Sequence, residues 1–348
     1  MGVVQRLPAA RWGPAAGLGA IILVGAVIGF AVSRPPAPPA AVNVPAAPAA
    51  PRTAFGYSAV DDPVHHEVVL FGGVDSYSQT WLWNGKRWTL THPSTSPTGR
   101  FDAPAAFDPD TGQVMLYGGR LADGELAGDT WAWDGTTWRQ LDTGANGPPA
   151  GEGGAMAWDP GLQTMVLVAP IATPTGLTGE TWLWQGGAWS RVTGGNFPAG
   201  VTPIAAVFDD AIGTLFAIGG AGNPTNADGL FRFVPVRWNG GSWHVLPARQ
   251  VDSFAGLAED PISGRLIVAA ENGFPVVPAT STAWSWTGSD WQTLHNTQGP
   301  PWPQAEVTDL AHGRLLLFAT LLPASQDTPQ TVYVWEWQGT HWARVDGG

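Results

Sequence analysis

The sequence predicts an all-β fold, a six-bladed β-propeller that is preceded by a single N-terminal transmembrane helix. Three observations predict the propeller. A tryptophan motif recurs six times at nearly constant spacing, a second strand–turn–strand pattern lies upstream of each copy, and 46 Gly and 32 Pro accompany only 13% charged residues. This composition favours many short strands joined by turns over long amphipathic helices.

The repeated motif is W-x-G-x-x-W, and its copies begin 50, 51, 54, 48 and 51 residues apart. Self-similarity at one period indicates a stacked-repeat architecture. The copies are WNGKRW (83–88), WDGTTW (133–138), WQGGAW (184–189), WNGGSW (238–243), WTGSDW (286–291) and WQGTHW (337–342).

Each motif predicts a hairpin, because Asn-Gly and Asp-Gly are favoured centres of two-residue turns. With Asn84-Gly85 as the turn, Trp83 lies opposite Lys86 and Trp81 lies opposite Trp88. Alternation along the strands then places the three tryptophans on one face, which must be covered by a neighbouring sheet. The same register pairs Trp131 with Trp138, Trp182 with Trp189, Val236 with Trp243, Trp284 with Trp291, and Trp335 with Trp342.

A second hairpin is expected upstream of each motif. Residues 105–119 (AAFDPDTGQVMLYGG) read as a strand, a turn with Asp, Pro and Gly, and an apolar strand. Four strands per unit, named A to D, and six units make a propeller, with a parallel solenoid as the alternative. The equivalent segments are 58–73, 156–169, 206–220, 256–270 and 307–320.

The units resemble those of the kelch family and of galactose-oxidase-like propellers, over residues 54–348. The resemblance implies a kelch-type ring, and three units depart from it where Ala169-Pro170, Ala269-Ala270 and Ala319-Thr320 stand for a glycine pair. The copper chemistry of galactose-oxidase-like enzymes is not carried over, because the chain has no cysteine for their cysteine–tyrosine cross-link. The residues that carry the resemblance are Gly72-Gly73, Gly118-Gly119, Gly219-Gly220, Asp129–Trp131 and the late tryptophan of each unit.

The first 53 residues predict a membrane anchor and a spacer. The stretch 17–32 is apolar throughout, and with its flanks it reaches the roughly 20 residues that span a bilayer core. Arg6 and Arg11 precede it, which favours the N-terminus inside and the propeller outside the cytoplasm. A signal peptide cleaved at Ala31-Val32-Ser33 is the alternative, and it would make the protein secreted. The expected parts are a cytoplasmic N-terminus at 1–12, a transmembrane signal anchor at 13–33, a Pro/Ala-rich linker at 34–53 and the propeller at 54–348.

Composition excludes several functions. Without cysteine there are no disulfides, thiolate metal sites or cysteine nucleophiles. The net charge is −12, and residues 1–51 hold three arginines and no acid, so the remainder carries 13 basic against 28 acidic residues. Such a domain is a poor binder of nucleic acid. The chain also lacks a phosphate-binding glycine loop, H-E-x-x-H and G-x-S-x-G, so no catalytic residue and no cofactor are expected.

An aspartate occupies the A–B turn of every unit. An aspartate at such a turn accepts a hydrogen bond from the backbone two residues on, so we interpret the set as turn residues and expect no metal. The histidines have no close ligand spacing either. The turn aspartates are Asp61, Asp108, Asp159, Asp209, Asp260 and Asp309.

Candidate binding residues lie in the B–C and D–A loops, which share one face of the disc. These loops vary in length, whereas the A–B and C–D turns are short, and variable loops on a rigid scaffold are where binding sites are usually built. Trp302 is the candidate for stacking on a ligand. The remaining candidates are Arg100, Asp102, Arg120, Asp123, Glu125, Asp129, Asn226, Asp228, Arg232, Glu271 and Asn272.

The sequence therefore favours a monomeric, non-enzymatic scaffold at the cell membrane that binds an envelope protein or a glycan. The alternative is an envelope hydrolase or lyase with an acidic site in the propeller funnel. A sensor domain for another membrane protein is a third interpretation.

Overall fold

The structure is a computed structural model that describes residues 50–53, 55–174, 176–221, 232–247, 256–272, 280–294, 303–320 and 330–346. The expected anchor at 13–33 and the candidate residues Asn226, Asp228 and Trp302 lie outside these ranges. Within them, no helix has the length and apolar character that crossing a membrane requires.

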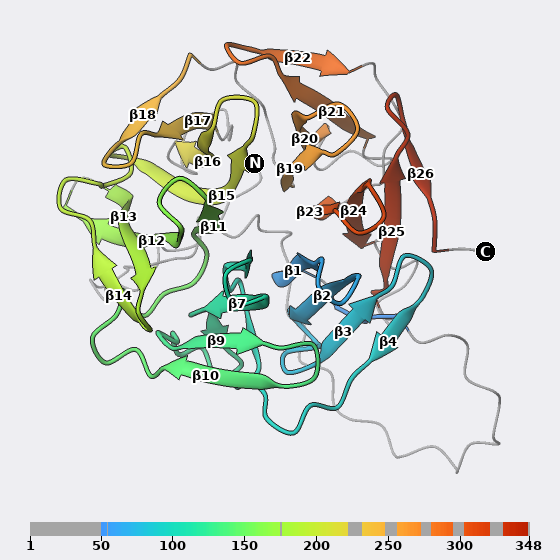
Figure 1. Ribbon diagram of the computed structural model, residues 1–348, viewed down its shortest axis with the longest axis horizontal. Helices are drawn as coiled ribbons and strands as arrows, with labels where there is room; N and C mark the ends of the chain where they lie inside the picture. The colour runs from blue at the N-terminus through green and yellow to red at the C-terminus, as the bar shows by residue number, and fades with distance from the viewer. Residues whose placement is uncertain are drawn as a thin grey trace, which may run out of the picture. The chain divides into compact units, whose positions relative to one another are not determined.

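Six four-stranded antiparallel sheets stand around a common centre (Figure 1). The A strand of each sheet is innermost and contacts the A strands of both neighbouring sheets, so the sheets form a closed ring. The predicted all-β, six-bladed propeller is confirmed. The A–B and C–D turns lie on one face of the ring, here the turn face, and the B–C and D–A loops lie on the other, here the loop face.

The blades follow one another along the chain. The A and B strands of blades 1 to 6 are β1 (Tyr57–Asp62) and β2 (Glu67–Gly72), β6 (Ala105–Asp108) and β7 (Gln113–Tyr117), β11 (Ala155–Asp159) and β12 (Thr164–Thr173), β15 (Val201–Asp209) and β16 (Thr214–Ala221), β19 (Gly256–Asp260) and β20 (Arg265–Asn272), and β23 (Pro303–Asp309) and β24 (Arg314–Thr320).

The C and D strands complete the sheets, and a small two-stranded sheet joins β5 (Arg100–Phe101) to β8 (Arg120–Leu121). The C and D strands are β3 (Thr80–Trp83) and β4 (Trp88–Leu90), β9 (Thr130–Trp133) and β10 (Trp138–Asp142), β13 (Gly176–Gln185) and β14 (Ala188–Arg191), β17 (Arg232–Trp238) and β18 (Trp243–Val245), β21 (Thr280–Trp286) and β22 (Trp291–Leu294), and β25 (Val332–Trp337) and β26 (Trp342–Arg344).

The core is divided into six clusters, one at each interface between neighbouring blades. At the closing interface, Trp81, Trp83 and Trp88 of blade 1 share a cluster with Phe318 of blade 6. Each described sheet contains strands of its own blade only, so the ring closes without strand exchange in the described part of the chain. The tryptophan hairpins therefore join blade to blade, as their spacing predicts.

The register within the hairpins differs from the prediction. Trp83 pairs with Trp88, and Trp81 pairs with Leu90. The turn is centred on Gly85-Lys86, one residue later than expected. The N–H of Asn84 donates to the carbonyl of Arg87 at 3.4 Å, and the side-chain oxygen of Asn84 accepts hydrogen bonds from the backbone N–H groups of Lys86 and Arg87. In all six blades the two tryptophans of one motif face each other, and the rings of Trp83 and Trp88 lie 5.3 Å apart. The predicted pairs, from Trp81 with Trp88 to Trp335 with Trp342, are wrong, because each true partner lies two residues further along the D strand.

A buried hydrogen bond links three of the blade interfaces. The indole N–H of Trp138 donates to the hydroxyl of Thr80 in the preceding blade at 3.0 Å. Trp189 bonds Thr130 at 2.8 Å, and Trp243 bonds Thr181 at 2.9 Å. All three threonines are fully buried. Each lies on the C strand of its blade and pairs with a residue of the B strand beside it.

Blades 4, 5 and 6 carry apolar residues where these threonines stand. The equivalent positions by register are Pro235, Ala283 and Val334. The indole N–H groups of Trp342 and Trp88, which face blades 5 and 6, are buried without a hydrogen-bond partner. The polar links therefore lie at three consecutive interfaces, between blades 1 and 4, and the equivalent donors at the interfaces of blades 5 with 6 and 6 with 1 have no acceptor.

The turn aspartates cap their own turns, as predicted. Asp108 accepts the backbone N–H of Asp110 at 3.0 Å, and Asp209 accepts that of Ala211 at 3.0 Å. In blade 1 the capping residue is Asp62, which accepts the N–H of His65 at 3.2 Å. The assignment of Asp61 to this set is wrong, because the ladder places Asp62 at the end of the A strand.

Two histidines of A–B turns bridge neighbouring blades. His65 Nδ1 lies 2.8 Å from Asp62 Oδ2, and its ring lies against Gly135 in the C–D turn of blade 2. His312 is held in the same way by the aspartate of its turn, and its ring lies against Gly85 of blade 1. Both faces of blade 1 are thus joined to a neighbour through an imidazole.

Candidate functional site

The loop face of blades 1 to 3 is built from four segments: 73–79, 91–104, 118–129 and 143–154. Glycine pairs bring these loops together. The N–H of Gly73 donates to the carbonyl of Arg100 at 3.0 Å, and the N–H of Gly119 donates to that of Gly151 at 2.7 Å. Both glycines have positive φ (+88° and +98°), and a Cβ on Gly119 would lie 2.9 Å from the Phe101 carbonyl. Only glycine permits loops to cross at this distance.

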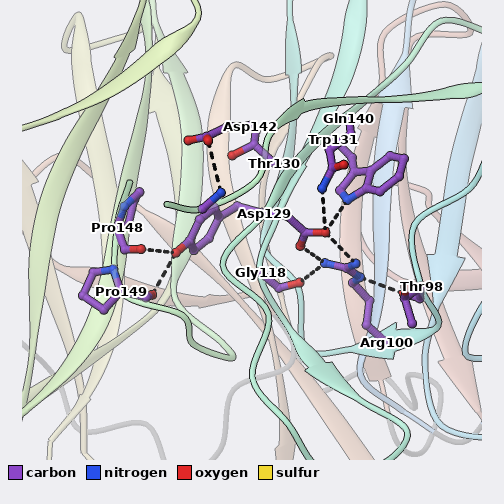
Figure 2. Close-up of polar contacts among 12 residues, drawn as sticks. Thr98, Arg100, Gly118, Asp129, Thr130, Trp131, Gln140, Asp142, Pro148 and Pro149 are labelled. Atoms are coloured by element: carbon purple, nitrogen blue, oxygen red, sulfur yellow. Dashed lines mark hydrogen bonds and ion pairs between the residues drawn. The ribbon is translucent and has the colours of Figure 1, made fainter. Parts of the chain in front are cut away.

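Arg100 and Asp129 form a buried ion pair between two of these loops (Figure 2). Arg100 is 1% exposed, and its guanidinium donates to both carboxylate oxygens of Asp129, at 2.6 and 3.2 Å. It also donates to the carbonyls of Gly118 and Thr98. Burial alone would raise the pKa of Asp129, but hydrogen bonds from Arg100 and Trp131 lower it below its usual range. These two candidates thus hold the loops in place, and a role in binding stays a prediction.

A second group of charges, here the Asp102 cluster, consists of Asp102, Arg120 and Glu152. Arg120 donates from Nε and Nη2 to the two carboxylate oxygens of Glu152, the second at 2.5 Å, and from Nη1 to the carbonyl of Gly124 at 2.8 Å. The three side chains come from three different segments of the loop face and are all partly exposed. The structure therefore unites two sequence candidates with Glu152, which the sequence analysis missed.

Asp102 is the unusual member of this cluster. Its φ is +53°, which a non-glycine residue rarely adopts, and its carbonyl accepts the N–H of Gly153 at 2.6 Å. Burial raises the pKa of Asp102 to about 6; the charge of Glu152 raises it further, and Arg120 opposes them. A carboxyl group that gains its proton near neutral pH therefore lies beside a guanidinium–carboxylate pair.

The remaining candidates are spread over the face. Asp123 and Glu125 are exposed at the tip of the loop that β8 begins, where the N–H of Glu125 donates to Asp123 at 3.1 Å. Arg232 begins β17 and Asn272 ends β20, one residue after Glu271, so all three lie at the loop-face ends of their strands. Among the described contacts, no hydrogen bond or ion pair joins the side chains of Asp123 and Glu125 to the Asp102 cluster.

Glu306 is a second residue that the sequence analysis missed. It lies on the innermost strand β23, both carboxylate oxygens are buried without a hydrogen-bond partner, and its stem contacts Gly256 of blade 5. Burial raises the pKa of Glu306 well above its ordinary 4.5. A signal was present in the sequence, because this position, three before the turn aspartate, is apolar in the other blades: Ala59, Ala105, Met156, Ala206 and Leu257.

Among the described residues, no three His, Asp or Glu side chains are grouped closely enough to hold a metal ion.

The structure itself defines the class as a six-bladed β-propeller, and comparisons with known proteins add a likeness of fold alone. No protein-family model and no curated protein matches the sequence. Among solved structures, the chain resembles YjhT with a TM-score of 0.54 and 12% identity, over 85% of this chain and 99% of that one. It also resembles the Aleuria aurantia lectin in complex with α-methyl-L-fucoside (TM-score 0.51, 16% identity, 81% of this chain and 91% of that one).

A third similar structure is the GH74 enzyme of Niastella koreensis, with a TM-score of 0.50 and 16% identity over 82% of this chain. The alignment spans 46% of that enzyme's length. At such identities the three likenesses concern the fold alone.

Proposed function

We propose that the protein is a membrane-anchored, extracytoplasmic, kelch-like propeller that binds an envelope protein or glycan through its loop face. The observation that carries this proposal is the Asp102 cluster. Three charged side chains from three separate loops meet there, partly exposed, on a ring whose sheets supply the rigidity. Charged groups gathered on loops of a rigid scaffold favour recognition of a ligand.

The path of the chain is consistent with this arrangement. Residues 50–53 lie on the loop face, where the carbonyl of Pro51 accepts the N–H of Val332 at 3.0 Å and the carbonyl of Arg52 accepts the hydroxyl of Ser76. The apolar stretch 17–32 supports the anchor, and the glycine pairs at the loop crossings support the kelch-like assignment.

The test is proximity labelling from the full-length protein in its native cell, comparing Asp123→Lys with Asp110→Lys. Both aspartates are exposed in blade 2, Asp123 on the loop face and Asp110 on the turn face. We expect Asp123→Lys to reduce labelling of the main partner at least several-fold and Asp110→Lys to leave it unchanged. Equal labelling by both variants would remove the loop face as the binding surface.

One observation favours the alternative of an envelope hydrolase or lyase. Asp102, whose pKa is about 6, has the protonation behaviour of a general acid, and Glu152 supplies a second carboxylate nearby. In that case the full-length protein should release soluble products from purified envelope polysaccharide, and Asp102→Asn should lower the rate by about 100-fold or more. A preparation that releases nothing over the pH range 5–8 argues for the scaffold.

A further inference from the structure

The C–D turn of blade 4 places one asparagine side chain among three hydrogen-bond donors and an imidazole. Asn239 and Gly240 begin this turn, and both are exposed. The side-chain oxygen of Asn239 accepts the backbone N–H groups of Gly241 at 3.0 Å and of Ser242 at 2.8 Å. It also accepts the hydroxyl of Ser242 at 3.3 Å. Three donors therefore meet at one amide oxygen.

His244 completes the surroundings of this amide. Its Nε2 lies 2.8 Å from Nδ2 of Asn239 and 3.2 Å from Oγ of Ser242. Because the three donors identify Oδ1 as the oxygen, Nδ2 is the nitrogen that faces the imidazole. The oxygen thus faces groups that stabilise negative charge, and the nitrogen faces a group that can give it a proton as it leaves.

Gly240 supplies a nucleophile. A glycine has no side chain to shield its backbone nitrogen, so that nitrogen can approach the side-chain carbonyl carbon of a preceding asparagine. Gly240 has φ +90°, and a Cβ built on it would meet no described atom within 4 Å. The turn therefore has room to bring the nitrogen and the carbonyl carbon together.

Blade 1 holds the matched turn without the serine and the histidine. Asn84 precedes Gly85, and its side-chain oxygen accepts two backbone N–H groups, at 3.2 and 3.1 Å, as in blade 4. Arg87 and Thr89 stand where blade 4 has the serine and the histidine. The ring of His312 also packs against Gly85 and restricts the turn. The chain thus contains its own control for the groups around Asn239.

We infer that Asn239 is a self-modification site, at which this turn converts the asparagine to aspartate and isoaspartate through a succinimide. The backbone nitrogen of Gly240 gives its proton to solvent and attacks the side-chain carbonyl carbon, while the three donors hold the charge on the oxygen. The imidazolium form of His244 gives a proton to the amide nitrogen, the C–N bond breaks, and ammonia leaves with the electron pair of that bond. The imidazole regains its proton from solvent, and water then opens the ring at one of its two carbonyl groups.

Blade 2 shows that the aspartyl product fits such a turn. Asp134 stands at the equivalent position, and its carboxylate accepts the N–H groups of Thr136 and Thr137, each at 2.9 Å. Conversion of Asn239 to aspartate therefore adds a negative charge to the turn face and preserves the cap. The isoaspartyl product instead lengthens the main chain by a methylene group. This site is separate from the ligand site proposed on the loop face.

The test is peptide mass spectrometry of the full-length protein, incubated near neutral pH and sampled over weeks. The mass gain of the change from amide to acid is followed separately in the peptides that contain Asn239 and Asn84. We expect Asn239 to convert at least about tenfold faster than Asn84, because a positioned proton donor commonly accelerates a reaction by about 100-fold and solvent competes at an exposed turn. His244→Gln should remove most of this advantage. His341→Gln, at an exposed histidine in the C–D turn of blade 6, is the matched control and should leave both rates unchanged.

Unfolding in urea separates the fold from the local sequence. Both sites are Asn-Gly pairs, so their rates should converge in the unfolded chain. Three outcomes would overturn the inference. Conversion of Asn239 no faster than that of Asn84 in the folded protein would mean that the hydrogen bonds protect the amide. An unchanged rate in His244→Gln would remove the imidazole as proton donor, and a difference that persists in urea would assign it to the sequence alone.

Discussion

Replacement of Thr130 by valine should destabilise the propeller by about 1–3 kcal/mol, the cost of a buried donor that loses its acceptor. Thr130 is fully buried, and its hydroxyl accepts the indole N–H of Trp189 at 2.8 Å. Valine preserves the shape of the side chain, so packing changes little. The loss therefore measures the polar link between blades 2 and 3.

The opposite substitution should stabilise the ring. Val334 is fully buried at the equivalent position of blade 6, and the indole N–H of Trp88 is buried without a partner. Val334→Thr supplies the missing acceptor at nearly constant volume. The expected gain is about 0.5–1.5 kcal/mol, the net value of one hydrogen bond.

The assay is urea unfolding of the full-length protein, followed by tryptophan fluorescence and by circular dichroism, with Thr89→Val on an exposed position of β4 as the control. Thr130→Val should lower the midpoint, Val334→Thr should raise it, and Thr89→Val should leave it within error. A neutral Thr130→Val together with a destabilising Val334→Thr would refute the role given to the threonines.

Three other perturbations test the blade contacts. Gly135→Ala should lower the free energy of unfolding more than Gly240→Ala in the same assay. Both glycines have φ +90°, but only at Gly135 would a Cβ meet an imidazole ring, that of His65. Equal losses of stability would mean that the contact between His65 and Gly135 does not stabilise the ring. Arg100→Met should cost about 2–3 kcal/mol, since it leaves the partly buried carboxylate of Asp129 without its cation, and a loss below about 1 kcal/mol would contradict this. Burial raises the pKa of Glu306 above 4.5, so the folded chain keeps a proton that the unfolded chain releases, and stability falls as the pH rises from about 4.5 through the folded-state pKa. Glu306→Gln should flatten that slope and be the more stable chain at about pH 8; unchanged slopes would show that the carboxyl is not the source.

Short-range patterns in the sequence were sufficient for the ring. The motif from Trp83 to Trp88 and its five later copies predict the number of blades, and the turn aspartates predict their own caps. The register of the hairpins was predicted wrongly, because a shift of the turn by one residue moves every cross-strand partner by two. The turn is centred on Gly85-Lys86 and not on Asn84-Gly85, which moves the partner of Trp81 from Trp88 to Leu90.

The candidate site was less predictable, because its residues meet only through loop crossings. Arg100 and Asp129 are 29 positions apart, and the sequence contains no signal that one will neutralise the other. Glu152 stands in a loop without periodicity, so nothing singled it out beside Arg120. Glu306 is the exception. When the six inner strands are aligned, it is the one carboxyl residue at a position that is apolar in the other five.

The closing interface has a consequence for the synthesis of the chain. The aromatic face of blade 1, with Trp81, Trp83 and Trp88, has Phe318 of blade 6 as its partner, and among the strands that the structure describes none from one end pairs in the sheet of the other. The tryptophan hairpin of blade 1, β3 and β4, is therefore made early, and its indoles stay uncovered until the last blade has been made. A nascent chain in that state is prone to aggregate, so we expect a chaperone to shield the first blade until the ring can close.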